Sequence, residues 1–404
     1  MRKPLATRIP LFLLCVATLP AQAAEPPKLS LEWDLRARHE QVDDDAFANA
    51  ARADTLRLRA GLRFAFGNGW NGLLEGEGVA GNNHYNSGAN GRTNLPAVID
   101  PRDAELNQAW LGWKGARGNG SLGRQRLLFD NQRWIGNVGW RQNEQTFDAL
   151  ALEFAPRKDI ALRYAFLDRV HRVNGDDAID PLARERKLST HLLHGAYKRG
   201  AQQWSGYAWL HKDRDVATAS ASTYGLRWTG SMPMAKTKFG WTLEAAHQRD
   251  HANNPLHFSH TYWLLEPALT VRDITARAGW EHLGGNGRHA LQTPLATLHA
   301  FNGWADKFLV TPVNGLEDRY LGVGGAFGRE RAGSRQAWQL TWHDYRADHG
   351  SSRYGREWDA SWSVPLAKGL SGMLKYADYR ADSYARDTRK LWLQIEYKGS
   401  HRIE

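Results

Sequence analysis

The chain has 404 residues, and its 53 lysines and arginines outnumber its 43 aspartates and glutamates, giving a formal net charge of +10. Its single cysteine, Cys15, excludes a disulfide within the chain and a cysteine-based metal site. Beyond the first 23 residues no run of about 18 apolar residues occurs, which argues against a helical membrane protein.

The N-terminal 23 residues have the pattern of a cleaved signal peptide. A basic start precedes a short apolar stretch, and a small-x-small cleavage motif follows. We therefore expect export, removal of residues 1–23, and a single domain over residues 24–404. The features are the basic residues Arg2, Lys3 and Arg8, the apolar residues 11–19 and the motif Ala21-Gln22-Ala23.

Residues 54–66 alternate between apolar and basic side chains. A period of two is typical of a strand, because successive side chains point to opposite faces. The run is about twice the ~5–6 residues usual in a soluble sheet and close to the ~9–11 that a tilted strand needs to cross a bilayer. It therefore predicts a membrane-spanning strand with an apolar face and a cationic face. The apolar set is Leu56, Leu58, Leu62, Phe64 and Phe66, and the cationic set is Arg57, Arg59 and Arg63.

The same alternation recurs as far as Tyr397 and predicts about 18 strands. A barrel of ~16–18 strands encloses an aqueous channel, and closure leaves no strand edge unpaired in lipid. The 18 Trp and 13 Tyr residues fit the aromatic girdles of such barrels. We therefore predict an all-β fold, a transmembrane antiparallel up-and-down β-barrel over about residues 29–397. Clear examples are residues 29–36, 160–166, 239–244, 274–280, 338–342, 354–362 and 390–397, whereas 69–81 and 188–198 are less regular.

The predicted connections alternate between short turns and long polar loops, as expected of outer-membrane barrels. Short turns at 67–69 and 156–159 are assigned to the periplasmic side. Two segments, 129–145 and 284–317, are too rich in apolar residues for plain solvent loops. We interpret both as loops that fold into the lumen, with packing on the barrel rim as the alternative. The long loops assigned to the outside lie near 82–103, 171–187, 249–258 and 284–317.

The energy of lipid-exposed charge indicates which face of each strand lies inside. One arginine at the middle of the lipid face costs roughly 2–4 kcal/mol, so three would approach the whole stability of a domain, ~5–15 kcal/mol. We therefore expect the cationic faces to line the lumen, with Glu75 and Glu77 paired to some of the arginines. For any one arginine, a structural ladder of ion pairs is the alternative to a selectivity filter. The arginines assigned to the lumen are Arg36, Arg38, Arg57, Arg59, Arg63, Arg163 and Arg277.

The sequence contains no recognisable catalytic or metal-binding pattern. Neither a G-x-S-x-G elbow nor an H-E-x-x-H motif occurs, so we expect no catalytic residues, no enzymatic activity, no metal and no cofactor. His343 and His349 bracket Asp344 and Asp348 and are interpreted as solvated residues of strand ends and loops. The basic excess indicates an anionic partner in the lumen or lipopolysaccharide at the surface, and we expect no nucleic-acid partner.

Several segments carry more specific sequence motifs than the alternation of strand residues. They are Gly123–Arg126, Arg133–Asp148, Thr293–Phe308 and Thr311–Tyr320. These segments resemble the alginate export family of Gram-negative outer-membrane porins, and the resemblance covers about residues 29–397. It implies an 18-stranded barrel in the outer membrane, with an electropositive constriction that passes an anionic polysaccharide. It also implies that arginines in the matched segments line the pore and bind substrate, namely Arg124, Arg126, Arg133 and Arg141.

The hypothesis that follows is passive diffusion of an anionic solute, with a polyuronate such as alginate as first candidate. One alternative is an uptake porin for small anions or sugar acids. Another is a structural or adhesive barrel with a closed lumen, whose loops bind lipopolysaccharide or a partner. Expected contacts are outer-membrane lipid, lipopolysaccharide and the barrel-assembly machinery. The chain is shorter than the alginate exporter itself and continues past Tyr397, so gating loops and the assembly signal are expected to differ.

Overall fold

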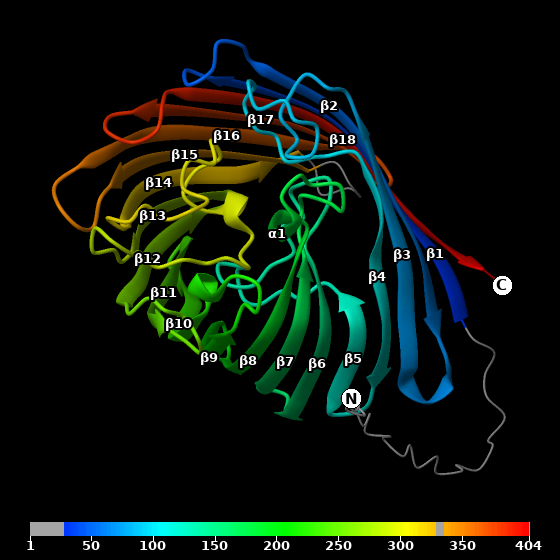
Figure 1. Cartoon of the computed structure of the whole chain (residues 1–404). Helices are drawn as coiled ribbons and strands as arrows, with labels where there is room; N and C mark the ends of the chain where they lie inside the picture. The colour runs from blue at the N-terminus through cyan, green and yellow to red at the C-terminus, as the bar shows by residue number, and fades with distance from the viewer. Residues whose placement is uncertain (1–27, 329–334, 404) are drawn as a thin grey trace, which may run out of the picture.

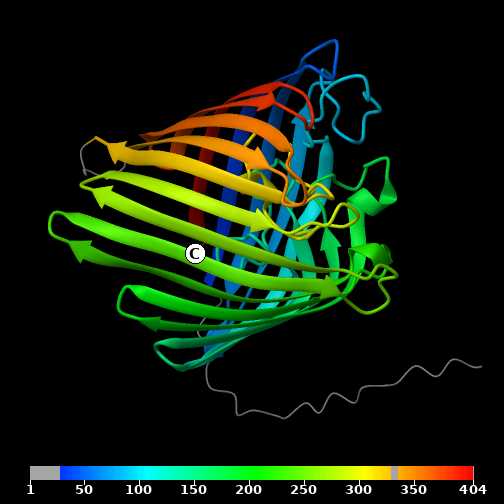
Figure 2. The same cartoon turned by 90° about the vertical axis from the view of Figure 1, so that its left-hand side faces the viewer.

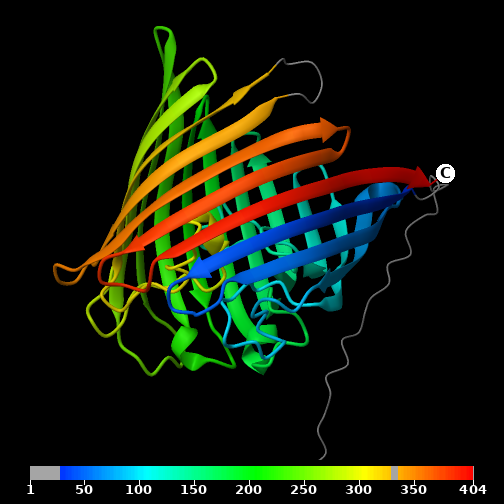
Figure 3. The same cartoon turned by 90° about the horizontal axis from the view of Figure 1, so that it is seen from above.

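A single closed sheet forms the molecule. The computed structural model describes residues 28–328 and 335–403. Eighteen antiparallel strands each pair with the next along the chain, and β18 pairs with β1 to close the barrel (Figure 1 and Figure 3). The predicted up-and-down barrel of about 18 strands is therefore confirmed. The predicted signal peptide, residues 1–23, lies outside the described residues and stays a prediction.

Within residues 28–328 and 335–403, helical structure is confined to short turns between the strands. They are α1 Pro181–Arg184, η1 Gly67–Gly69, η2 Ala217–Ala219 and η3 Leu298–Ala300. Among the described residues, no helix combines the length and the apolar character needed to cross a bilayer. The strands are β1 Lys28–Asp44, β2 Ala51–Ala65, β3 Trp70–Gly81, β4 Asp103–Lys114, β5 Gly118–Gln125, β6 Thr146–Arg157, β7 Ile160–His171, β8 Glu185–Arg199, β9 Gln202–His211, β10 Ala221–Met234, β11 Thr237–Asp250, β12 Ser259–Val271, β13 Ile274–Leu283, β14 Leu316–Phe327, β15 Gln336–Arg346, β16 Arg353–Ala367, β17 Leu370–Ala381 and β18 Thr388–Ile403.

Strand β2 shows how the alternation sorts side chains between the two faces of the wall. Leu56 and Leu58 are 47% and 48% exposed on the outside, whereas Arg57 between them is fully buried inside. Register pairing keeps like faces together, since Leu58 lies opposite Leu35 and Arg57 opposite Arg36. The predicted assignment of the apolar face to the outside and the cationic face to the inside is thus confirmed for this strand.

Long and short connections gather at opposite ends of the barrel (Figure 2). The short turns include 158–159 and 200–201, and the long loops include 82–102 and 172–184. The strands run obliquely between the two ends (Figure 2). The predicted alternation of turns and loops is therefore confirmed, and the less regular segments 69–81 and 188–198 belong to β3 and β8.

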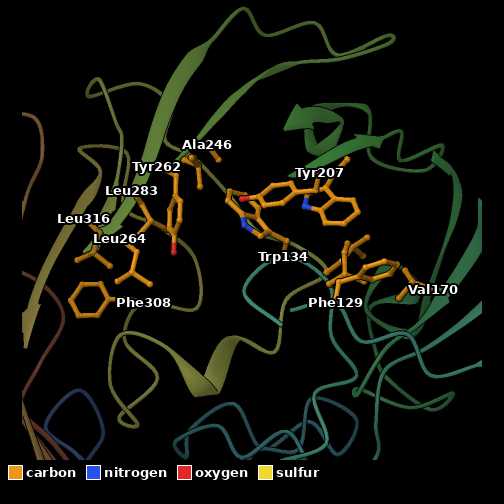
Figure 4. Close-up of a cluster of buried hydrophobic side chains, with 14 of the residues drawn as sticks. Phe129, Trp134, Val170, Tyr207, Ala246, Tyr262, Leu264, Leu283, Phe308 and Leu316 are labelled. Carbon is orange, nitrogen blue, oxygen red and sulfur yellow. The ribbon is translucent and has the colours of Figure 1, made fainter. Parts of the chain in front are cut away.

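Two long loops leave the wall and enter the barrel (Figure 1). They are the β5–β6 loop, residues 126–145, and the β13–β14 loop, residues 284–315. Their apolar side chains pack against inward residues of the strands, so the main hydrophobic core lies inside the barrel (Figure 4). A backbone bridge between Ile135 and Leu295 joins the two loops to each other. The interpretation that these segments fold inward is therefore confirmed.

Candidate functional site

Four arginines on β1 and β2 form one side of the lumen. They are Arg36, Arg38, Arg57 and Arg59, and together we call them the arginine wall. All four are buried, although charged side chains are rarely buried unless they are paired. Their position follows from the inward parity of both strands, because Arg36 and Arg57 are register partners.

The arginine wall holds the β5–β6 loop by its carbonyl oxygens. Arg36 Nη1 donates to the carbonyl oxygens of Gly139, Trp140 and Arg141 at 3.2, 3.2 and 3.3 Å. Arg38 Nη2 donates to the Trp140 carbonyl at 2.6 Å. In the same way, Arg59 Nη2 donates to the carbonyl of Gln142 at 3.0 Å. Guanidinium groups suit this task because each carries five donors and keeps spare ones after pairing with a carboxylate.

Carboxylates on the neighbouring strands neutralise the arginine wall. Arg57 Nη2 lies 2.6 Å from Asp34 Oδ1 and 3.3 Å from Glu396 Oε1. Arg59 pairs with Glu77, as expected from their cross-strand register. Glu75 pairs instead with Arg126, at 2.7 Å. The predicted pairing is therefore confirmed for Glu77, whereas the partner of Glu75 is an arginine of the β5–β6 loop and not one of the strand arginines.

Four buried carboxylates form another part of the lumen wall. They are Glu281 of β13, Asp318 of β14, and Glu357 and Asp359 of β16, and we call them the carboxylate wall. No more than 4% of any of them is exposed. Because they occupy the inward parity of three strands, they face the β13–β14 loop.

The carboxylate wall holds the β13–β14 loop by its N–H groups. The backbone N–H of Ala305 donates to Glu357 at 2.6 Å, and that of Trp304 donates to Asp359 at 3.1 Å. The side-chain amide of Asn302 donates to Glu281 at 2.7 Å and to Asp318 at 3.1 Å. Asn302 and Gly303 have φ angles of 55° and 84°. After this turn, the successive N–H groups of Trp304 and Ala305 point at two neighbouring carboxylates, Asp359 and Glu357.

Lys375 of β17 joins the two loops. Its Nζ lies 3.9 Å from the ring centre of Trp140 in the β5–β6 loop and 3.7 Å from that of Trp304 in the β13–β14 loop. The same ammonium donates to Nε2 of His299 at 2.7 Å, so Nδ1 of His299 carries the proton and donates to Asp306 at 2.7 Å. The contacts of this buried ammonium with two aromatic faces and one imidazole therefore take the place of its hydration by water.

The two loop arginines that the resemblance singled out tie the loops to each other. Arg133 Nε lies 2.9 Å from Glu281, and its Nη2 donates to Asn302 at 2.9 Å. Arg141 lies 3.1 Å from Asp306 and 3.3 Å from Glu40. Burial alone would lower the pKa of Arg141, but Glu40 and the other neighbouring carboxylates raise it above its usual value. Both side chains are buried, and their predicted substrate-binding role stays a prediction.

Arg124 and Arg126 lie on different sides of the wall. Arg126 points into the lumen, where it contacts Glu144 and Glu75. Arg124 pairs with Asp148 at 3.0 Å. Asp148 follows the inward residue Phe147 on β6 and lies opposite Arg124 in the β5–β6 pairing, so both side chains belong to the other face of the wall. The structure thus places Arg124 on the outer side, which differs from the prediction that it lines the pore. It lies at the end of β5, where an outward arginine costs only ~0–1 kcal/mol.

A cavity of about 430 Å³ opens into the lumen between β1, β3 and β18. In most ion pairs made by its lining residues, the cation is more exposed than its carboxylate; the exception is Arg57, which is fully buried, with Asp34, which is 18% exposed. The side chain of Arg126 is 30% exposed against 9% for Glu75, and that of Lys398 is 56% exposed against 18% for Asp34. Arg63, 43% exposed, pairs with Glu32, 32% exposed. The charge that this cavity presents to solvent is therefore cationic, although its formal charges nearly balance.

A second cavity, about 260 Å³, lies beneath the β13–β14 loop. Arg277 lines it beside the ring of Tyr320, 5.9 Å away, and makes no ion pair within residues 28–328 and 335–403. His343 also lines it, buried and 2.9 Å from Asp318, so the expectation of a solvated histidine is wrong. Because His343 lies on an inward strand position, the loop covers it. Four lining carboxylates make this cavity more acidic than the first: Glu266, Glu281, Asp318 and Asp359.

Arg163 completes the predicted set of lumenal residues. It pairs with Glu153 at 3.0 Å and lies 5.1 Å from the ring centre of Phe129 in the β5–β6 loop. The carboxylate wall and Lys375 were not among the predicted site residues. Their inward parity was the only signal, since Glu357 and Asp359 alternate with apolar residues in 354–362.

Comparisons with known proteins agree with this architecture. A family model described as alginate export matches residues 28–263. No curated protein sequence matches the chain. Among solved structures, the outer membrane protein OpdK of Pseudomonas aeruginosa is 15% identical with a TM-score of 0.70, over 92% of this chain and 99% of OpdK. OccAB2 of Acinetobacter baumannii is 15% identical with a TM-score of 0.72, over 93% of this chain and 98% of OccAB2. A structure of OpdK with vanillate is 14% identical with a TM-score of 0.68, over 92% of this chain and 99% of that chain. These structures share the barrel fold.

Proposed function

The chain belongs to the alginate export family, and from that premise we propose that it is an outer-membrane channel for an acidic polysaccharide such as alginate. The polymer diffuses passively, without an energy source. The barrel of this chain is porin-like and carries an apolar outer face suited to lipid. An export family also agrees with the prediction that the chain is not an enzyme.

One observation carries the proposal for an anionic solute. The 430 Å³ cavity is lined by Arg126 and Lys398, and Arg63 pairs with its lining residue Glu32; each of these three cations is more exposed than the carboxylate it pairs with here. A solute entering this cavity meets ammonium and guanidinium groups first, while the acids lie behind them. Guanidinium binds a carboxylate through paired donors. Several such partly satisfied cations provide weak binding sites in series, which allow both entry and release.

The inward loops supply the constriction of the proposed channel. In the described conformation they fill much of the lumen, so a polymer passes only when part of this packing moves. The two walls hold the loops through main-chain and side-chain hydrogen bonds, four of them from Arg36 and Arg38 to the β5–β6 loop. Conductance is therefore expected to depend on the walls, and ion preference on the exposed cations.

Recording of single channels in planar bilayers tests the proposal. In a salt gradient, the reversal potential of the wild type should show a preference for anions, and long polyuronate should block the current. Replacing Arg63 and Lys398 by Ala should weaken both effects. The matched control is Arg157→Ala, which removes an exposed arginine at a short turn and should change neither. A cation-selective wild type, or a preference unaffected by the double substitution, contradicts the proposal.

A second candidate is an uptake porin for small anions or sugar acids. Two observations favour it. The cavity of about 430 Å³ has the size of a small-molecule site, and the similar barrel OpdK has been solved with vanillate, a small carboxylate. Polymer block separates the two candidates. An exporter is blocked by long polyuronate, whereas a small-solute porin is blocked mainly by short acids.

A barrel with a permanently closed lumen is the third outcome of the same recording. The two inward loops and the apolar core between them favour it. Such a barrel shows no current in any salt, and its surface loops then serve to bind lipopolysaccharide or a partner. Absence of current from a barrel that is folded by circular dichroism and by heat-modifiable migration contradicts both channel candidates.

A further inference from the structure

Three potential metal ligands meet at the stem of the β13–β14 loop. They are His282 near the end of β13, Glu317 near the start of β14, and Asp348 in the β15–β16 connection. Their ligand atoms all lie within 4.8 Å of one another. We infer that these three side chains form a binding site for a divalent metal ion, with Zn²⁺ as the first candidate.

The fold brings the ligands together by register. His282 and Glu317 are 35 positions apart in sequence but are direct partners in the β13–β14 pairing, so their side chains share one face. Asp348 is held beside them because its Oδ2 accepts the backbone N–H of Gly285 at 2.9 Å. The three ligands therefore come from both arms of the loop stem and from the adjacent connection.

The imidazole of His282 is buried and directed at this site. Its side chain is only 10% exposed and stacks on Trp263, with ring centres 5.3 Å apart and planes 7° apart. Nδ1 has no hydrogen-bond partner among the described residues and lies 3.7 Å from Oδ1 of Asp348, too far for a hydrogen bond. Nε2 lies 3.5 Å from the hydroxyl of Thr261. A buried nitrogen without a partner is costly, and a metal ion between it and the carboxylates would satisfy it.

The donor set indicates the class of metal. One imidazole and two carboxylates suit Zn²⁺ and similar divalent transition metals, with bonds of about 2.0–2.2 Å, and leave a coordination position for water. Ca²⁺ and Mg²⁺ prefer oxygen ligands alone. Arg319 donates to Oε2 of Glu317 at 2.8 Å, so the metal would share this carboxylate with a guanidinium through the other oxygen. Removing that competing charge should therefore strengthen metal binding.

The position of the site gives it a consequence that does not depend on the transported solute. His282 and Glu317 flank the two ends of the loop that packs against the carboxylate wall. A metal ion bound to both, and to Asp348, would fasten the stem of this loop to the neighbouring connection. Metal binding should therefore stabilise the barrel and keep the loop folded inward.

Titration of the purified full chain in detergent, first treated with a chelator and then given ZnCl₂ alone, tests the inference. The wild type should bind one ion per chain by calorimetry and melt at a higher temperature with the ion than without it. His282→Ala and Asp348→Asn should each weaken binding by at least about tenfold. His257→Ala is the matched control, since it removes an exposed histidine that lies 3.5 Å from Asp250, and should bind as the wild type does.

Arg319→Gln separates a metal site from a merely structural cluster. It should bind Zn²⁺ more tightly than the wild type, a gain that misfolding cannot produce. If the wild type binds no ion, or if His282→Ala binds as tightly as the wild type, the inference is overturned. The three residues are then only an ion-pair cluster around His282.

Discussion

The two sides of the lumen hold their loops with opposite chemistry. The arginine wall of β1 and β2 donates to carbonyl oxygens of the β5–β6 loop. The carboxylate wall of β13, β14 and β16 accepts from N–H groups of the β13–β14 loop. Each wall therefore binds polar groups whose partial charge is opposite to its own: the arginines bind carbonyl oxygens, and the carboxylates bind N–H groups.

This comparison separates two roles for charge inside a barrel. Buried charges that bind the loops, such as Arg36 and Glu357, hold the constriction together. Partly exposed charges, such as Arg126 and Lys398, meet the solute in the proposed channel. The lumenal location of a charged residue does not by itself decide between these roles, because both groups point into the lumen. Exposure and the identity of the partner decide it.

The largest effect is expected from breaking the arginine wall. In the double variant Arg36→Met and Arg38→Met, the β5–β6 loop loses four hydrogen bonds, and Glu396 and Asp100 lose cationic partners. Breaking a buried pair costs about 3–5 kcal/mol. The melting temperature in detergent should fall, and the single-channel conductance should rise. A folded double variant with unchanged conductance would show that the wall does not hold the constriction.

A smaller effect is expected from the carboxylate wall. Glu357→Gln keeps the volume of the side chain but removes its charge and offers an amide to the N–H of Ala305. A poorly satisfied buried group costs about 1–3 kcal/mol. Limited proteolysis should cut the β13–β14 loop faster than in the wild type. Glu153→Gln, whose partner Arg163 is partly exposed, serves as control and should leave the cleavage rate unchanged.

Acid should weaken the docking of the β13–β14 loop. Burial, which Asp306 only partly offsets, holds the pKa of His299 well below its usual range. Release of the loop returns this pKa to about 6.5, so the released state binds the extra proton and docking weakens as pH falls below that value. Asp306 adds to the loss only in stronger acid. Although burial opposes it, His299 and Lys390 hold the pKa of Asp306 well below its usual range.

The pH dependence is measured by proteolysis of the wild type and of His299→Gln at several pH values between 7.5 and about 5. Cleavage in the β13–β14 loop of the wild type should accelerate toward the acid end, by less than Glu357→Gln causes at neutral pH. The variant should lose this dependence. Equal acceleration in both proteins would assign the effect to another group.

The smallest effect is expected from Arg124→Ala. Arg124 lies on the outer side of the wall in a partly exposed pair with Asp148, and such pairs contribute about 0–1 kcal/mol. The reversal potential should stay that of the wild type. Arg126→Ala, two positions away in the lumen, should shift it toward weaker anion preference. If both variants shift it equally, side-chain direction is not what distinguishes these arginines.

Periodicity was sufficient to predict the barrel, the strand number and the inward face of residues such as Arg57. It could not predict partners, because the loop carbonyls that Arg36 binds come from Gly139–Arg141, more than 100 positions along the chain. The same limit hid the role of Glu357, whose partner is a backbone N–H that no sequence pattern marks.

The placement of Arg124 follows the parity of β5, because Leu122, two positions earlier, is 64% exposed on the outside and the register of β5 is regular on both sides. The prediction that Arg124 lines the pore came from the family resemblance and did not use this parity. The meeting of His282 with Glu317 was equally hidden, since it depends on the register of two strands separated by a long loop.

The backbone bridge between Ile135 and Leu295 joins the two loops, so that they are expected to move together. Gly136 donates to Leu295 and Thr297 donates to Gln132, at 2.9 and 3.1 Å, which strengthens that union. Because neither loop can leave its wall alone without breaking this contact, their release is cooperative. The current through an open barrel should then switch between two levels, with dwell times set by whichever wall releases first, and graded intermediate levels should be absent.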